Sequence, residues 1–309
     1  AQAQRAASQH TGRQFAGRCA QRGGAGVTRP DMQGAGSGNR SGFFMAAYLA
    51  CGKYRLSLER PLVMGIVNVT PDSFSDGGRH FDTARAVAHG RQLLQEGADI
   101  LDIGGESSRP GAQAVSAEEE LRRVLPVIEA LAADGIPISV DTVKPEVMRR
   151  TVAAGAAIIN DIAALRAPGA LAAAAESGAA VRLMHMQGEP GTMQADPRYG
   201  DVVAEVHDFL AQRVAAAQAA GIPTERIIVD PGFGFGKRLA HNLALLRQLD
   251  RFCDLGACVL AGLSRKSMLG EITGRKVSLR DTASVAAALL AARNGARILR
   301  VHDVAATKD

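Results

Sequence analysis

The chain has 309 residues, of which 47% are hydrophobic, so it is long enough for one large α/β domain with a sizeable core. Its formal net charge of +5 equals the excess of six arginines over one aspartate in residues 1–44, and the rest of the chain is electrically balanced. A balanced body gives no electrostatic basis for nucleic-acid binding. The absence of Trp and the 4% aromatic content argue against a stacking platform for single strands.

The N-terminal segment differs in composition from the rest of the chain. Residues 1–45 are rich in Gly, Ala, Gln, Arg and Ser, so we expect a disordered leader or a non-native extension, followed by one domain over residues 46–309. No apolar run reaches the roughly 18 residues that a membrane-spanning helix needs. None of the four cysteines forms a Cys-x-x-Cys pair, which favours a reducing cytoplasm; they are Cys19, Cys51, Cys253 and Cys258.

Eight short apolar runs alternate with helical stretches along the folded part. The runs are LVMGIV (62–67), ADILDIGG (98–105), PISVD (137–141), AAIIN (156–160), AAVRLMH (179–185), RIIVD (226–230), CVLAGL (258–263) and RILRVHD (297–303). The helical stretches cover about 83–97, 117–133, 145–154, 169–176, 198–220, 241–250 and 281–294. This alternation predicts parallel strands with right-handed crossovers, and eight strands favour a closed (β/α)8 TIM barrel. The alternative is an open doubly wound sheet, but no glycine-rich dinucleotide turn follows the first strand.

Two further features flank the predicted barrel. Residues 51–61 (CGKYRLSLERP) are expected to form a small strand pair that caps the floor of the barrel. The chain stops at Asp309, directly after the eighth run, so we expect the final helix to be absent and apolar barrel surface to be exposed.

Polar residues follow every apolar run, and folding does not require their side chains. They are Asn68, Glu106, Ser107, Ser108, Arg109, Asp141, Asn160, Asp161, His185, Asp230, Ser264, Arg265, Lys266, Arg300, His302 and Asp303. In a TIM barrel the carboxyl ends of the strands meet at one face, where active sites lie, so we expect these residues to line one pocket. Nothing near His185 completes a metal site, which favours a packed or hydrogen-bonded histidine. The motif GFGFGK is too short for a phosphate-binding P-loop, and Arg238 follows where Ser or Thr is required.

Eight motifs in this order resemble those of the dihydropteroate synthase family. They are NVTPDSFSDGG, GGESSRPG, SVDT, IIND, LMHMQG, DPGFGFGK, LSRKSMLG and RVHD, and they span about residues 60–305. The resemblance implies a pterin-binding TIM barrel that condenses 6-hydroxymethyl-7,8-dihydropterin diphosphate with 4-aminobenzoate. The products would be 7,8-dihydropteroate, an intermediate of folate biosynthesis, and diphosphate. The family is a sulfonamide target, uses Mg²⁺ and is commonly homodimeric through late barrel helices, so a homodimer is implied if the C-terminal helix is present.

The resemblance assigns the pterin ring to one set of strand ends. Asp141, Asn160, Asp230 and Lys266 would bond the ring, and Met184 would lie against its face. A pterin presents clustered N–H donors and a carbonyl, which buried carboxylates and amides complement. For any one of these acidic or amide residues, capping of the following loop remains an alternative.

The resemblance assigns the diphosphate to a second set. Arg300 and His302 lie two residues apart on the last strand, so their side chains share a face, and Asn68 joins them at the phosphate end. Asn68 would also contact Mg²⁺, which favours phosphate sites with few protein ligands. Asp141, Lys266, Arg300 and His302 are therefore the predicted catalytic residues.

The resemblance implies two loops, one aromatic ring and one serine around the aminobenzoate. The first loop contains Thr70, Pro71, Asp72 and Phe74, and the second contains Ser107, Ser108, Arg109 and Pro110. Phe235 would pack on the aminobenzoate ring, and Ser264 would contact its carboxylate. The two loops would close over the substrates. A helix that begins after Lys266 offers free N–H groups that suit the carboxylate of aminobenzoate.

The reaction is expected to proceed without a covalent intermediate. The chain has no nucleophile elbow and no cysteine–histidine signature, and an aromatic amine is already a nucleophile. We expect diphosphate to leave first and the amine to attack inside the closed loops. Two other functions remain open: a corrinoid-linked folate methyltransferase, which would not need Arg300 with His302, and a non-catalytic pterin-binding paralogue or inactive fragment.

Overall fold

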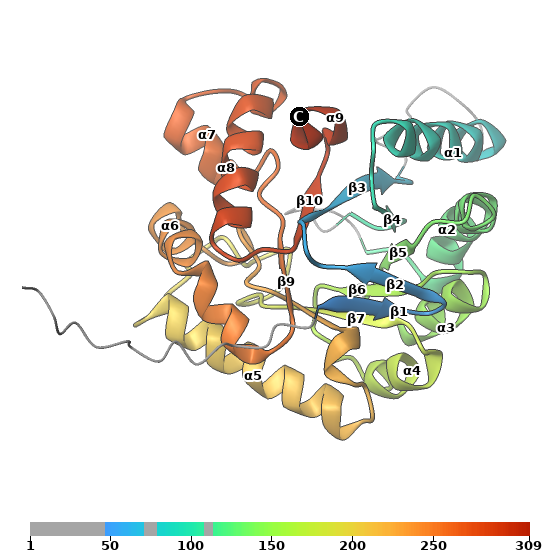
Figure 1. Cartoon of the computed structure of the whole chain (residues 1–309), viewed down its shortest axis with the longest axis horizontal. Coiled ribbons are helices and arrows are strands. Elements are labelled where there is room, and N and C mark those ends of the chain that lie inside the picture. Colours follow the sequence, from blue (N-terminus) through green and yellow to red (C-terminus); the bar gives the residue numbers. More distant parts are fainter. Residues whose placement is uncertain (1–46, 71–78, 108–113) are drawn as a thin grey trace, which may run out of the picture. The chain divides into compact units, whose positions relative to one another are not determined.

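A computed structural model describes residues 47–70, 79–107 and 114–309. The predicted leader and parts of two predicted loops lie outside these ranges. The first described element is an antiparallel hairpin of β1 (Tyr48–Cys51) and β2 (Tyr54–Ser57). The predicted strand pair is therefore present, but it begins three residues before the predicted range of 51–61. Leu49 and Cys51 are buried against the amino-terminal ends of the barrel strands, so the hairpin closes that end of the barrel (Figure 1).

Eight parallel strands form a closed barrel, so the barrel prediction is confirmed and the open sheet is wrong. The strands are β3 (Leu62–Asn68), β4 (Ile100–Gly104), β5 (Ile138–Asp141), β6 (Ile158–Asp161), β7 (Ala180–Met184), β8 (Ile227–Asp230), β9 (Cys258–Ala261) and β10 (Ile298–Val301). The barrel closes where β10 pairs with β3, from Ile298 opposite Leu62 to Val301 opposite Gly65.

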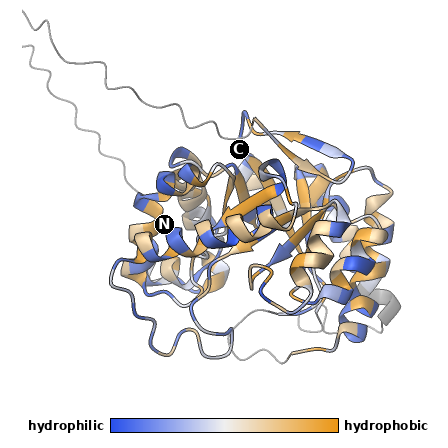
Figure 2. Cartoon of the chain, turned by 90° about the horizontal axis from the view of Figure 1, so that it is seen from below, coloured by the Kyte–Doolittle hydropathy of each residue, from blue (hydrophilic) through white to orange (hydrophobic). Residues whose placement is uncertain are grey.

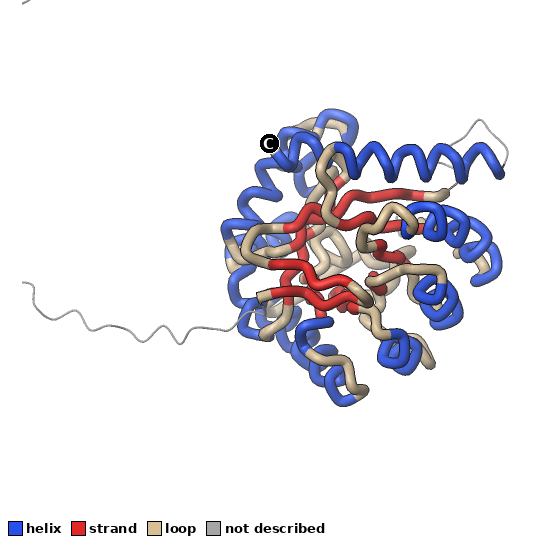
Figure 3. The backbone as a smooth tube through the Cα atoms, turned by 45° about the vertical axis from the view of Figure 1, so that its right-hand side comes forward, coloured by secondary structure: helices blue, strands red, loops and turns tan. Residues whose placement is uncertain are grey.

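Helices surround the barrel and alternate with its strands (Figure 3). They are α1 (Arg79–Gln95), α2 (Ala117–Ala132), α3 (Pro145–Ala153), α4 (Ala170–Ser177), α5 (Val202–Ala219), α6 (Leu239–Arg247), α7 (Ser267–Thr273), α8 (Asp281–Arg293) and α9 (Val304–Lys308). Short 3-10 turns lie at Thr224–Arg226, Leu249–Leu255 and Val277–Leu279. In the described ranges, no helix is both long and apolar enough to span a bilayer.

The C-terminus differs from the expectation that no helix follows the last strand. The five-residue helix α9 begins directly after β10, where the Asp303 side chain accepts a hydrogen bond from the Ala306 N–H. Val304 is fully buried against β3, and Lys308 Nζ lies 3.0 Å from Asp99 Oδ2. This short helix therefore covers part of the seam between the last and first barrel strands.

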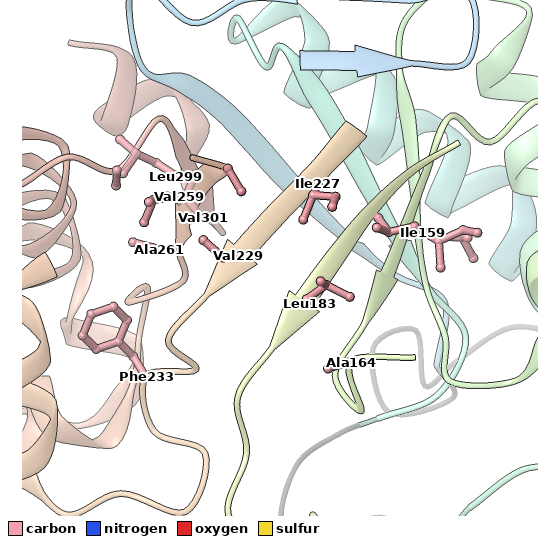
Figure 4. Packing of buried hydrophobic residues seen from close by; sticks show 14 of the residues in the cluster. Ile159, Ala164, Leu183, Ile227, Val229, Phe233, Val259, Ala261, Leu299 and Val301 are labelled. Atoms are coloured by element: carbon pink, nitrogen blue, oxygen red, sulfur yellow. The ribbon is translucent and has the colours of Figure 1, made fainter. Parts of the chain in front are cut away.

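Strand alternation divides the core into two regions. Outward-facing side chains such as Ile159, Leu183 and Val229 pack against the helices, together with Phe233 from the loop after β8 (Figure 4). The strands are mostly hydrophobic in Figure 2, whereas the helices carry polar residues as well. Inward-facing side chains at the amino-terminal ends form a second apolar cluster with the hairpin, which includes Met64, Ile100, Ile158, Ala180, Ile228, Cys258 and Ile298.

The inward-facing positions become polar toward the carboxyl ends. One pleat beyond the apolar layer, β4, β6 and β7 carry Asp102, Asn160 and Arg182, all of which are buried. The closed floor and polar upper half confine charged chemistry to the carboxyl end, as expected for this fold.

Candidate active site at the carboxyl ends of the strands

Arg300 joins three strands at the carboxyl end of the barrel. Its Nε donates to Asp102 Oδ2 at 2.7 Å, and its Nη2 donates to Asp141 Oδ2 at 3.3 Å. Asn160 Nδ2 donates to both oxygens of Asp102, at 3.1 and 3.0 Å. The structure thus brings Asp141, Asn160 and Arg300 together as the sequence predicts, around a fourth residue, Asp102, that the sequence analysis missed.

This cluster perturbs the ionisation of its two carboxyl groups in opposite directions. Burial acts to raise the pKa of Asp102, but the positive charge of Arg300 and hydrogen bonds from neighbouring groups together bring that pKa below its ordinary value. Burial, followed by the negative charge of Asp102, raises the pKa of Asp141 to about 7 despite Arg300. The site therefore holds one firmly ionised carboxylate beside one that titrates near neutrality.

A second arginine, Arg182 of β7, links the other predicted pterin residues. Its Nε donates to Asp230 Oδ2 at 3.0 Å, and its Nη2 lies 3.1 Å from Met184 Sδ. Its Nη1 donates to Asn160 Oδ1. Asp230 and Met184 face each other across the β7–β8 pair, so both belong to the same pocket wall as Asn160.

Lys266 and Phe235 form a contact between the loops that follow β9 and β8. Lys266 Nζ lies 4.1 Å from the centre of the Phe235 ring, within the range of a cation–π interaction. Burial, then the nearby Arg300 charge, lowers the pKa of Lys266 to about 8. Lys266 is also the residue that precedes α7, so the amino end of that helix lies at the site, as predicted.

His302 and Ser264 are held together. The Nδ1 of His302 lies 2.9 Å from Ser264 Oγ, and the His302 N–H donates to the same oxygen at 3.2 Å. This contact places a residue predicted for the diphosphate beside one predicted for the aminobenzoate. Ser264 is buried, so its hydroxyl is fixed by this partner.

The loop after β8 is anchored by a buried lysine. Lys237 Nζ lies 2.9 Å from His185 Nδ1 and donates to the carbonyl oxygens of Gly232 and Phe235, each at 3.0 Å. Burial, then Lys237, lowers the pKa of His185 to about 3, so the neutral ring accepts this bond. The prediction of a hydrogen-bonded His185 is confirmed. Because the carbonyls hold Lys237, it anchors the loop rather than cradling a phosphate.

Asn68 ends β3 beside Gly104, at the same end of the barrel as Asp141. Thr70 and Ser107 are the described residues at the roots of the two predicted loops. The other loop predictions fall outside the described ranges: Pro71, Asp72, Phe74, Ser108, Arg109 and Pro110. Among the residues described, no group of three or more His, Cys, Asp or Glu side chains could hold a metal ion.

Three buried charged residues at or next to the site were not among the predicted site residues: Asp102, Arg182 and Lys237. Each lies within a quoted motif or strand, and Asp102 and Arg182 sit at inward positions of otherwise apolar runs. A charge inside a run that must be buried is itself a signal, because such a group needs a partner.

The chain's sequence and fold match known proteins over nearly all of the barrel. A family model described as "Pterin binding enzyme" matches residues 64–302. The dihydropteroate synthase of Escherichia coli strain K12 is 54% identical over 253 residues, which cover 82% of this chain and 90% of that protein. The chain belongs to the dihydropteroate synthase family.

Solved structures support the same assignment. Dihydropteroate synthase from Xanthomonas albilineans with 4-aminobenzoic acid superposes with a TM-score of 0.81 at 62% identity, covering 85% of this chain and 95% of that one. The same enzyme in complex with 7,8-dihydropteroate gives a TM-score of 0.78 at 59% identity, with the same coverage. A Yersinia pestis dihydropteroate synthase, 49% identical, was solved as a sulfonamide drug complex. The family match includes every strand end from Asn68 to His302, so the resemblance inferred from the motifs is confirmed.

Proposed function

We propose that this protein catalyses the reaction of the dihydropteroate synthase family, the condensation of 6-hydroxymethyl-7,8-dihydropterin diphosphate with 4-aminobenzoate. The observation that carries the proposal is the joint presence of Asp141, Asn160, Asp230, Lys266 and Arg300 around one end of the barrel. Relatives at more than 50% identity carry the synthase name, and related structures hold 4-aminobenzoic acid and dihydropteroate.

The pterin ring would lie among the acceptors of three strands. Asp141, Asn160 and Asp230 offer carboxylate and amide oxygens to its N–H groups, and the Lys266 ammonium donates to a ring acceptor. Met184 would contact the ring face. Burial strengthens each of these bonds because water does not compete.

The leaving diphosphate needs positive charge at the mouth of the barrel. Arg300 lies on the last strand, His302 directly follows that strand, and Asn68 lies at the end of the neighbouring strand β3. These groups would stabilise the negative charge that develops as the diphosphate leaves. Asp141 and Asp230 would stabilise positive charge on the pterin, so loss of diphosphate precedes attack by the amine.

Mg²⁺ fits the residues present. A Cβ built on Gly104 would lie 4.0 Å from both Asn68 Oδ1 and Asp141 Oδ2 and 3.4 Å from Asp141 Cβ, so the two oxygens line the small space beside this glycine. Oxygen atoms of this kind suit a hard cation that retains several waters. When bound beside Asn68, the ion would neutralise charge on the phosphate oxygens.

The aminobenzoate would lie between the pterin and the α7 end of the barrel. Phe235 would pack on its ring, and the Ser264 hydroxyl and the N–H groups at the start of α7 would donate hydrogen bonds to its carboxylate. Thr70, Ser107 and the loops that follow them would exclude water during attack.

The function is tested by measuring diphosphate release from the pterin substrate with purified protein. Release that requires both aminobenzoate and Mg²⁺, and that stops with EDTA, supports the synthase. Pterin binding without release would support a binding paralogue instead. Transfer of a methyl group from a methylfolate to a corrinoid, without diphosphate release, would support the methyltransferase.

The pH dependence of kcat/KM for the pterin diphosphate should be narrow. Activity should rise through about pH 7 as Asp141 ionises and fall above about pH 8 as Lys266 loses its proton. The Asp102→Asn variant removes the charge that opposes ionisation of Asp141, so its acid limb should move to lower pH. The Lys266→Arg variant stays charged and should lose the alkaline limb. Unchanged limbs in both variants would contradict these assignments.

A homodimer through the late helices is part of the proposal. Large apolar side chains on neighbouring elements are half or more exposed: Ile272 (55%), Val277 (56%), Leu279 (58%), Leu289 (70%) and Leu290 (50%). Exposed large apolar side chains on elements that follow one another in the chain are typical of a protein interface.

The Leu289→Glu/Val277→Glu variant should shift the protein from dimer to monomer in analytical ultracentrifugation, because it places charges in this apolar cluster. The matched change Ala172→Glu, at an exposed position of α4, should leave the mass unchanged. A wild type that is monomeric at micromolar concentration would overturn the dimer proposal.

We also propose a cytoplasmic location. The three described cysteines are free, and burial raises the pKa of Cys51 and Cys258 to about 12, so both remain as thiols. Free thiols are usual in reducing compartments. Cell fractionation with detection of the native protein tests this assignment.

A further inference from the structure

Arg182 is a fully enclosed cation beneath the candidate pterin pocket. Its relative exposure is 4%, and the strand register places it beside Asn160 on β6, while Met184 lies opposite Asp230 on β8. Because Arg182 and Met184 are two residues apart, they face the same side of the strand, with Arg182 deeper by roughly 7 Å. The guanidinium therefore reaches the pocket wall from the barrel interior rather than from the mouth.

One guanidinium bonds the groups that three strands contribute to the pocket. Arg182 donates through Nε and Nη2 to Asp230 Oδ2, and through Nη1 to Asn160 Oδ1. Nη2 also contacts the sulfur of Met184. The side chain is only 5% exposed, so its contacts are almost all with the protein interior.

These bonds fix two orientations that a pterin would depend on. The Asn160 amide points its oxygen at Arg182 and its nitrogen at Asp102. The cation on one side and the anion on the other therefore fix the orientation of this amide. The Asp230 carboxylate is held by Arg182 on Oδ2 and by the Gly232 N–H on Oδ1, at 2.6 Å. A carboxylate offers about four acceptor sites and an amide oxygen two, so both groups retain capacity for a ligand.

We propose that Arg182 is a positioning residue that orients Asp230 and Asn160 for the pterin ring and supplies the counter-charge that Asp230 needs in the barrel interior. This inference rests on the proposed function, because it concerns the same site. A buried carboxylate without a charged partner is costly. The planar guanidinium directs two N–H groups at Asp230 Oδ2 and a third at Asn160 Oδ1, in fixed directions that an ammonium cannot reproduce. Arg182 acts through these two residues and on one substrate only.

A competing role for Arg182 is to occupy the pterin site while the substrate is absent. The planar N–H array of a guanidinium resembles the aminopyrimidinone edge of a pterin, so Arg182 would then occupy acceptors that the substrate needs. In that case its removal would strengthen pterin binding. The spare acceptor capacity of Asp230 and Asn160, and the approach of Arg182 from below, favour positioning.

The test compares three variants by isothermal titration with the pterin diphosphate alone and by steady-state kinetics. In Arg182→Met the Kd for the pterin should rise about tenfold or more, while the KM for aminobenzoate at saturating pterin stays within about twofold of wild type. Arg182→Lys keeps the positive charge but lacks the planar guanidinium, so its Kd for the pterin should lie between the values of wild type and Arg182→Met. Arg182→Ala leaves room for guanidinium ion, which should partly restore pterin affinity when added at a non-denaturing concentration.

The matched control is Arg226→Met. Arg226 is partly buried next to a barrel strand, and its Nε and Nη2 donate to the Ala179 carbonyl, away from the site. A folded Arg182→Met or Arg182→Lys protein with wild-type or tighter pterin affinity would overturn the proposal, as would an equal loss in Arg226→Met. If Arg182→Met does not fold, the pterin affinity of Arg182→Lys and its recovery in Arg182→Ala with added guanidinium test the proposal instead. A wild type that fails to bind the pterin would overturn the proposed function instead.

Discussion

The Arg300→Met variant should lose activity by about a thousandfold or more, the largest effect of any single change at the site. Arg300 bonds both Asp102 and Asp141, and under the proposed function it also faces the departing diphosphate. Its removal withdraws positive charge from the leaving group and leaves two carboxyl groups without their shared partner. We therefore expect the free energy of unfolding to fall as well, by about 3–5 kcal/mol. Steady-state kinetics and urea denaturation measure the two effects.

Two further variants separate charge from geometry in this prediction. Arg300→Lys keeps the positive charge but cannot bridge Asp102 and Asp141 with one planar fork, so it should recover stability more than activity. Arg293→Met removes an exposed arginine at the end of α8 and should change neither quantity. An Arg300→Met protein that retains activity within tenfold of wild type would exclude Arg300 from the chemistry.

The Gly232→Ala variant should displace the loop after β8 and reduce activity by about a hundredfold or more. Gly232 has a φ of +70°, and a Cβ built on it would lie 1.9 Å from the carbonyl oxygen of His185. Neither backbone can yield without moving the Asp230 strand end or the loop that carries Phe235. The measurements are the KM for aminobenzoate, the melting temperature, and a crystal structure of the variant.

The matched control for this change is Gly178→Ala. Gly178 has nearly the same φ, +72°, but a Cβ there meets nothing within 4 Å. The control variant should therefore lose only the roughly 1–2 kcal/mol of left-handed backbone strain and keep its activity. If the two variants behave alike, the backbone contact between Gly232 and His185 does not hold the loop.

The order of the elements and the strand ends could be predicted from the sequence because the barrel repeats one simple pattern. Each buried run is followed by a polar residue, and this pattern located Asp141, Asn160, Asp230 and Arg300 without coordinates. Helix boundaries were less exact for local reasons. For example, α5 begins at Val202 rather than near 198, because the Asp201 side chain accepts hydrogen bonds from the N–H groups of the first turn.

The buried charges could not be assigned partners from the sequence. Arg182 bonds Asn160, 22 residues earlier, and Asp230, 48 residues later, and only closure of the barrel brings these strands to one wall. Local periodicity treats a charge within an apolar run as an exception. The partners of Lys237 could not be predicted either. One is the side chain of His185, 52 residues earlier, and two others are backbone carbonyls in a loop whose path depends on left-handed glycines.

The pairing of β10 with β3 links the assembly of the site to the last step of barrel formation. Asp102 obtains its Arg300 partner from a strand 198 residues farther along the chain. During synthesis, the carboxyl groups of β4 and β5 must therefore stay hydrated until the final strand emerges. Enclosing them earlier would bury their negative charges without a positive partner. A nascent chain that lacks β10 cannot hold substrate in the finished arrangement, so competence for ligand arises only when the ring of strands is complete.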